Sequence, residues 1–103
     1  MLINKPMKRL KRLNSQECLW PYILKLVSEK PVHAYVLRER INKKFRFLPG
    51  MVTAYTTLYS LYLNDFVSRE IKGRRTVYKI TPKGRIELKK AAKFYKEMAK
   101  KLG

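Results

Sequence analysis

A run of hydroxyl-bearing side chains follows the turn signal Leu48-Pro49-Gly50 and recurs at the spacing of one helix face. At about 100° per residue, this face separates from the apolar residues of the same segment. It carries hydroxyl groups and one amide but no charge, from Thr53, Thr56, Thr57, Ser60 and Asn64. A solvent-facing surface in a basic chain would be expected to carry Lys or Glu, so this face indicates close approach to a partner. The alternative is an ordinary polar face, because Thr and Ser are only moderately disfavoured in helices.

A second group of chemistry-bearing residues is cationic and surrounds Gly73. Two segments with strand-like alternation, 66–71 and 76–80, flank Lys72-Gly73-Arg74-Arg75, and the central Gly predicts a β-hairpin. Lys72, Arg74 and Arg75 therefore belong to the hairpin tip, where they can neutralise phosphate groups. Cations on an edge hairpin also keep a protein soluble, and this remains the alternative for the tip.

The overall charge supports a polyanionic partner. Among 103 residues, 25 Lys and Arg stand against 7 Asp and Glu, a net charge of +18. Such self-repulsion destabilises a compact state, and a polyanion relieves it. A chain of this length forms one domain.

Several functional classes are excluded by what the composition lacks. One Cys and one His cannot form an internal disulfide or a Cys/His metal cluster in a single chain. The carboxylates are scattered, without a neighbouring His, a Gly-rich phosphate loop or a Ser elbow, so we expect neither an enzyme nor a cofactor. No run of about eighteen apolar residues occurs, so we expect no membrane association and a cytoplasmic, nucleoid-associated protein.

The elements that must position these groups are three helices, a hairpin and a long last helix. Helical periodicity predicts helices over 17–28, with Pro21 either in its first turn or kinking it, and over 33–45 and 51–64. Thr81 as N-cap and Pro82 at the first helical position begin a helix that runs to about residue 102. The order predicts a mainly α fold with a small β-hairpin, a winged helix-turn-helix with a long C-terminal dimerisation helix. We assign residues 1–14 to a basic N-terminal arm or short amphipathic lead-in, 15–82 to the DNA-binding domain and 83–103 to the dimerisation helix.

In a winged helix-turn-helix, the third helix enters the major groove of double-stranded DNA, and the wing lies across the adjacent backbone. The hydroxyl groups can bond phosphates or base edges, and the threonine methyl groups can meet thymine. Lys43 and Lys44, on the polar side of the second helix, are further candidates for DNA contact. No Arg, Lys or Gln on the hydroxyl face can read guanine, so sequence discrimination should be modest or drawn partly from DNA shape. The core-facing side of this third helix is predicted to hold Met51, Ala54, Tyr55, Leu58, Leu61 and Tyr62.

The last helix carries an apolar stripe that reaches the end of the sequence. Little of the chain's own core remains there to cover it, so a second subunit is the natural cover. The alternative is packing against the first helix. The predicted homodimer interface consists of Leu88, Ala91, Ala92, Tyr95, Met98, Ala99 and Leu102.

Three stretches also carry a family resemblance. They are Pro31-Val32-His33-Ala34-Tyr35, Thr53-Ala54-Tyr55-Thr56-Thr57-Leu58, and the segment from Gly73 to Arg85. Through these stretches, residues 17–103 resemble the PadR-type winged-helix transcriptional regulators. In that family the first two stretches read Pro-x-His-Gly-Tyr and Thr-x-Tyr-Pro-x-Leu, and the third forms the wing and the start of the last helix. The sequence departs from the family at Ala34, where Gly is usual, at Thr56, where Pro is usual, and at Asp65, where a Gly commonly precedes the wing.

The resemblance implies a homodimer, joined chiefly through the C-terminal helix, that binds a roughly palindromic operator and usually represses transcription. It makes Tyr35 and Tyr55 candidate contacts to the DNA backbone, although the helical wheel favours core packing for Tyr55. Some relatives bind small aromatic effectors near the dimer interface. The candidate residues for such a site are Trp20, Tyr22, Phe94 and Tyr95, for which core or interface packing is the stronger interpretation.

Two other functions remain open at this point. An architectural, chromatin-like protein that coats DNA with low specificity would fit the +18 charge and the lack of a base-reading Arg. An RNA-binding or ribosome-associated protein is the third hypothesis, and it is disfavoured because A-form grooves do not admit a reading helix.

Overall fold

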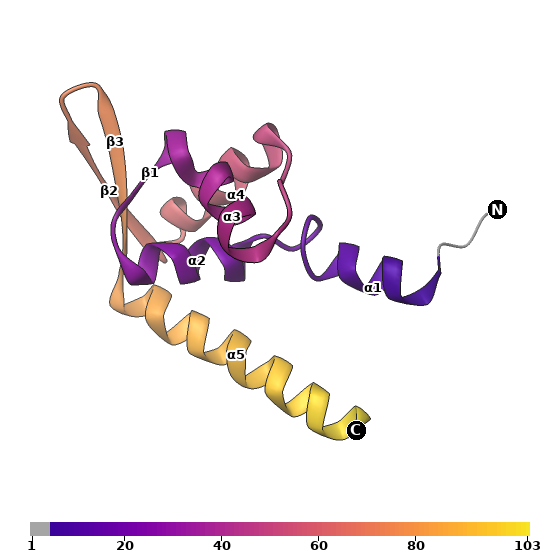
Figure 1. Cartoon of the computed structure of the whole chain (residues 1–103). Helices are drawn as coiled ribbons and strands as arrows, with labels where there is room; N and C mark the ends of the chain where they lie inside the picture. Colours follow the sequence, from indigo (N-terminus) through magenta and orange to yellow (C-terminus); the bar gives the residue numbers. More distant parts are fainter. Residues whose placement is uncertain (1–4) are drawn as a thin grey trace.

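The computed structural model describes residues 5–103 and consists of a helical core, a three-stranded antiparallel sheet and two helices that extend from that core (Figure 1). The elements in chain order are α1 (Pro6–Leu13), α2 (Trp20–Glu29), β1 (Val32–His33), the 3-10 turn η1 (Ala34–Val36), α3 (Leu37–Phe45), α4 (Met51–Leu63), β2 (Val67–Lys72), β3 (Arg75–Ile80) and α5 (Pro82–Leu102). This arrangement is the predicted winged helix-turn-helix with a long C-terminal helix.

The core lies where α2, α3 and α4 meet. Ile23 and Leu24 of α2, Leu37 and Ile41 of α3, and Ala54 of α4 are fully buried. Each such Leu or Ile stabilises the fold by about 1.5–3 kcal/mol relative to an exposed side chain. Of the two possibilities for Pro21, the structure has the first: it lies in the first turn of α2, where its missing N–H leaves no hydrogen bond unmade. This core fixes the angle between α3 and α4.

The segment after α2 corrects one prediction. Residues 33–45 were expected to form one helix, but Val32 and His33 form a short strand that pairs with Tyr78 and Val77 of β3. Pro31 disfavours helical backbone at Lys30, which is extended with φ −167° and ψ 159°. The chain therefore reaches the sheet edge first, and α3 begins only at Leu37.

The hairpin forms as predicted, within one residue at each end. Its strands pair from Val67 opposite Ile80 to Lys72 opposite Arg75. Gly73 has φ +62° and is the first of the two loop residues. A positive φ at this position is the pattern of a type II′ turn, whose twist matches the strands that it joins. The sheet order β1-β3-β2 leaves the hairpin tip beyond the helical core (Figure 1).

Helix α5 begins as its capping residues predict. The Thr81 hydroxyl accepts a hydrogen bond from the Gly84 N–H at 3.0 Å, and Pro82 is the first helical residue. Its first half packs on α2, where Ala91 is buried, and its second half projects from the core toward the C-terminus (Figure 1). No helix within residues 5–103 combines the length and the apolarity needed to span a membrane.

The predicted N-terminal arm is helical over most of its described length. Pro6–Leu13 form α1, and Met7 and Leu10 on this helix are exposed. Residues 1–4 of the predicted arm lie outside the described part of the chain. The described part of this segment is thus a helix, and its role as a basic arm or an amphipathic lead-in stays a prediction.

Asp65 has a left-handed backbone conformation, which agrees with the Gly that the family resemblance implies at this position. Its φ of +63° is left-handed, which Asp tolerates better than most residues and β-branched residues hardly adopt. We expect Asp65→Val to lower the free energy of unfolding by about 1–2 kcal/mol, while Asp65→Gly retains wild-type stability. Urea unfolding of both variants checks this. Equal stability of the two would show that the left-handed turn is not required.

Candidate nucleic-acid interface

Helix α4 is held by the turn that joins it to α3. Arg46 ends α3 in a left-handed conformation with φ +67°, and Gly50 caps the start of α4. The Arg38 side chain donates from Nε to the Pro49 carbonyl at 2.8 Å, which ties α3 to the turn. Because Ala54, Leu58 and Leu61 are buried, the opposite side of α4 must face outward.

The hydroxyl-bearing residues of α4 lie at the surface, as predicted, and Thr56, Thr57 and Ser60 line one pocket. Thr53, Thr56 and Ser60 are exposed and Thr57 is half-buried. The Thr56 hydroxyl donates to the Val52 carbonyl, and the Thr57 hydroxyl donates to the Thr53 carbonyl at 2.7 Å. These bonds use the single hydroxyl proton of each threonine within the helix, leaving only oxygen lone pairs for a partner.

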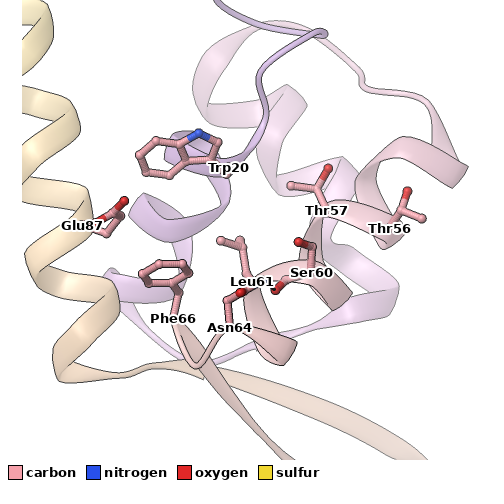
Figure 2. Close-up of a pocket in the computed structure, with 8 residues that line it drawn as sticks. All are labelled: Trp20, Thr56, Thr57, Ser60, Leu61, Asn64, Phe66 and Glu87. Atoms are coloured by element: carbon pink, nitrogen blue, oxygen red, sulfur yellow. Dashed lines mark hydrogen bonds between the residues drawn. The ribbon is translucent and has the colours of Figure 1, made fainter.

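One flank of α4 lines a pocket of about 450 Å³ between this helix and the α2 and α5 helices. Figure 2 shows Trp20, Phe66 and Glu87 on one side of the pocket and Ser60 and Asn64 on the other. Glu87 places a carboxylate there, 3.7 Å from the Lys90 ammonium. A carboxylate disfavours approach of a phosphate backbone. This flank of the predicted hydroxyl face is therefore less suited to DNA than the outer side of α4.

The outer side of α4 is largely apolar, which the helical wheel did not predict. Val52 is 77% exposed, Leu63 59% and Tyr59 48%. Together with Thr56 they occupy positions i, i+4, i+7 and i+11, which share one helix face. The signal was present in the sequence, because these positions lie opposite Ala54, Leu58 and Leu61.

Two residues that the helical wheel assigned to the core are exposed instead. Tyr55 is 37% exposed, so the interpretation of core packing for this residue was wrong, and Met51 is exposed at the first position of the helix. The buried stripe is narrower than predicted, because Ala54, Leu58 and Leu61 are the α4 residues that are buried. Tyr62 packs partly against the core.

A cation that the sequence pattern did not single out lies beside this outer face. The Arg69 guanidinium of β2 lies 4.1 Å from the ring centroid of Tyr62 and 5.8 Å from that of Tyr59. The neighbouring Tyr78 and Tyr62 side chains raise the pKa of Arg69, whose guanidinium is charged at physiological pH in any case. Stacking on aromatic rings holds this cation next to α4.

The predicted cations of the wing are at its tip and exposed. Lys72 lies 3.8 Å from the Glu70 carboxylate on the same strand. Within residues 5–103, no carboxylate forms an ion pair with Arg74 or Arg75. The tip and the C-terminal end of α5 lie at opposite ends of the molecule (Figure 1). These two arginines can therefore meet a phosphate backbone on the side away from α5.

The predicted DNA-contact residues near α3 differ in how free their side chains are to bind DNA. Tyr35 is 90% exposed in η1, directly before α3. Lys44 bonds the Glu29 carboxylate at 2.7 Å, and this hydrogen bond lowers the pKa of Glu29. Lys43 is exposed, and no ion pair involves it in the described part of the chain. Of the two lysines, Lys43 is therefore the more available cation.

The apolar stripe of α5 divides into a covered half and an open half. Ala91 is buried and Leu88 packs against the core. For these two residues the structure has the packing on the chain's own core that was the alternative to a dimer interface. Beyond them, the stripe lines an open groove of about 990 Å³ between α1 and α5. Besides Met7 and Leu10 of α1, the groove lining includes the predicted interface residues Leu88, Ala91, Ala92, Tyr95, Met98, Ala99 and Leu102.

The four aromatic residues considered for effector binding do not form one site. Trp20 lines the pocket beside α4, whereas Tyr22, Phe94 and Tyr95 line the groove. Tyr22 packs edge-on against Phe45, with ring centroids 4.7 Å apart, and burial raises the pKa of both Tyr22 and Tyr95. An effector site built from all four residues is therefore wrong, and one within the groove stays a prediction.

Comparisons with known proteins agree with this geometry. The family model described as the transcriptional regulator PadR-like family matches residues 23–90. A transcriptional regulator from Clostridium thermocellum is 25% identical with a TM-score of 0.74, covering 82% of this chain and 87% of its own. A PadR-like transcriptional regulator from Bacillus cereus is 22% identical with a TM-score of 0.73, covering 89% and 92%. F93 from STIV, a winged-helix DNA-binding protein, is 24% identical with a TM-score of 0.71, covering 84% and 91%. Among curated proteins, none matches the chain.

Proposed function

The chain belongs to the PadR-like family of transcriptional regulators, and from this premise we propose that it binds a roughly palindromic operator as a homodimer and represses transcription there. Membership makes it a DNA-binding regulator rather than an enzyme. In the proposed complex, α4 enters the major groove and the hairpin lies on the adjacent backbone. The protein then acts at the nucleoid.

One observation carries the DNA-binding proposal: an exposed helix face and two exposed wing arginines are available together. The outer side of α4 is free of carboxylates, and Arg69 lies beside it. A groove about 12 Å wide admits such a helix. Arg74 and Arg75 then supply the phosphate contacts that fix the register of the helix. Tyr35 and Lys43 extend these contacts to the start and end of the α3 region.

The homodimer is supported by the groove between α1 and α5. It exposes Phe94, Tyr95 and Met98 in one apolar surface. Contiguous apolar surfaces of this kind mark interaction sites, and a C-terminal helix of a second copy has the chemistry to fill it. Two copies joined in this way present two α4 helices to two half-sites of an operator.

Footprinting and competition binding test the proposal. Purified protein should protect discrete sites in genomic fragments and bind them more than about 10³-fold tighter than unrelated duplex at physiological salt. A ratio close to one would favour the architectural, low-specificity alternative. Structured RNA should compete poorly, and effective competition would favour an RNA-binding role. A reporter gene behind a protected promoter distinguishes repression from activation.

The wing arginines make a quantitative prediction about salt. Replacing both Arg74 and Arg75 by Ala should weaken binding at every DNA sequence and reduce the slope of log affinity against log salt by about 0.9 for each phosphate that the wing no longer neutralises. The control is Lys100→Ala with Lys101→Ala, which removes the same charge from the far end of α5. Equal slopes for the two double variants would contradict a wing contact to DNA.

A further inference from the structure

We propose that the outer face of α4, formed by Val52, Thr56, Tyr59 and Leu63, recognises thymine methyl groups in the major groove. The inference rests on the proposed function and adds to it the base chemistry that the helix reads. The operator half-sites are then selected for thymines at the positions that α4 faces, and guanine contacts contribute little to specificity at these positions.

The chemistry of this face is the first step. Val52 and Leu63 are the most exposed aliphatic side chains of α4 and have no hydrogen-bonding group. The Thr56 hydroxyl donates to the Val52 carbonyl, so its proton is not available to a base, and Thr56 offers a base only its methyl group and its oxygen lone pairs. Tyr59 contributes a ring over which Arg69 lies at 5.8 Å. The face is therefore an apolar strip with one phenol at its side.

The chemistry of the major groove is the second step. Guanine offers two acceptors there, which Arg or Lys reads, and adenine offers an acceptor and a donor, which Asn or Gln reads. None of these side chains occurs in α4. The thymine methyl is the one apolar group that an unmodified base pair presents in the major groove, and apolar contact is its usual mode of recognition. The strip therefore matches thymine better than any other base.

The surroundings of the strip distinguish DNA from a protein partner. Exposed apolar surface usually marks a protein interface. Here Arg69 flanks the strip, Lys43 and Arg46 precede the helix, and the Met51–Leu63 helix contains no carboxylate. The Glu87 carboxylate lies on the inner flank of α4, in the pocket that Thr56 also lines, whereas the cations flank the strip and precede the helix, where they complement the phosphate backbone. We therefore assign the strip to duplex DNA.

The test removes the methyl groups from the DNA and then from the protein. Deoxyuridine in place of thymidine deletes only the C5 methyl and keeps the base-pairing edge. With the full-length protein, each contacted thymine replaced in the operator should weaken binding about fourfold, which corresponds to the burial of one methyl-sized group. The same substitution in a duplex composed only of A·T pairs should also weaken binding. Uridine at positions outside the footprint should have no effect.

Matched variants link the effect to the helix. Val52→Ala and Thr56→Ser each shorten the strip, and Thr56→Ser keeps the hydroxyl that bonds within the helix. Both should reduce the preference for thymine over uracil while leaving the salt dependence unchanged, unlike the wing variants. Circular dichroism checks that both variants fold, which we expect because Val52 and Thr56 are exposed.

The outcomes separate this inference from the function on which it rests. Specific operator binding that is insensitive to uracil overturns the thymine inference and leaves the regulator intact. Equal binding of the all-A·T duplex with and without its methyl groups overturns the inference even if no preferred operator is found. Loss of a protein complex in Val52→Ala, with unchanged DNA affinity, also overturns it and assigns the strip to a protein partner.

Discussion

Replacing Leu102 by Asp is expected to convert the proposed homodimer to monomers and to lower affinity for the full operator by about 10²- to 10⁴-fold. Leu102 is 83% exposed in the isolated chain and lines the end of the groove between α1 and α5. A carboxylate there would be buried without a partner when a second copy fills the groove, and this cost opposes association. Binding at one half-site then no longer increases the effective concentration of protein at the other.

Light scattering measures the mass of this variant, and titration against full and single half-sites measures its affinity. Tyr95→Asp, which places the charge deeper in the groove, should give the same result. Both variants should bind a single half-site as the wild type does, because α4 and the wing are unchanged. Gly103→Asp adds the same charge one residue beyond Leu102 and is the control. An unchanged mass for Leu102→Asp and Tyr95→Asp would refute dimerisation through α5.

The Gly84→Ala variant is expected to lose about 3 kcal/mol or more of unfolding free energy, at or above the usual range for overpacking a core. A Cβ atom at this position would lie 2.0 Å from the Phe66 carbonyl oxygen and 2.8 Å from Ile80 Cγ1. The Phe66 carbonyl also accepts the Thr81 N–H at 3.2 Å, so it cannot move away without disrupting the start of α5. Helix α5 would have to shift from the base of the wing.

Helix propensity alone predicts the opposite sign, because Ala is about 1 kcal/mol more favourable than Gly in a helix interior. Chemical denaturation of Gly84→Ala therefore distinguishes the close approach from local propensity. Gly50→Ser is the control, since the nearest atom to its added Cβ is 3.9 Å away and Ser is a good N-cap. A Gly84→Ala variant as stable as the wild type would show that α5 does not pack so closely on the wing.

Elements with local signals were predictable from the sequence. Thr81 and Pro82 mark the start of α5, and Gly73 between alternating segments marks the hairpin, because capping and turn geometry depend on neighbouring residues only. The pairing of the two strands places Arg74 and Arg75 at the hairpin tip, away from the carboxylates. The order of helices and strands then predicts the winged helix.

The candidate site was predicted in part. The exposure of Thr53, Thr56 and Ser60 follows from periodicity, but the exposed position of Tyr55 and the proximity of Glu87 to Ser60 do not. The angular width of a buried stripe depends on how many neighbours a helix touches, and a helical wheel contains no neighbours. The strand β1 likewise requires β3, which is distant in the sequence.

The sequence by itself determined the helices α2, α4 and α5, the hairpin with its cationic tip and the resemblance to the family, but not the strand β1. Only the tertiary structure decided how exposed Val52, Tyr59 and Leu63 are on α4, that Arg69 lies over Tyr59, and that α1 and α5 enclose an open groove. The physical reason is the range of the interactions. Caps, turns and periodicity act within a few residues, whereas exposure, charge proximity and groove shape arise where distant segments pack.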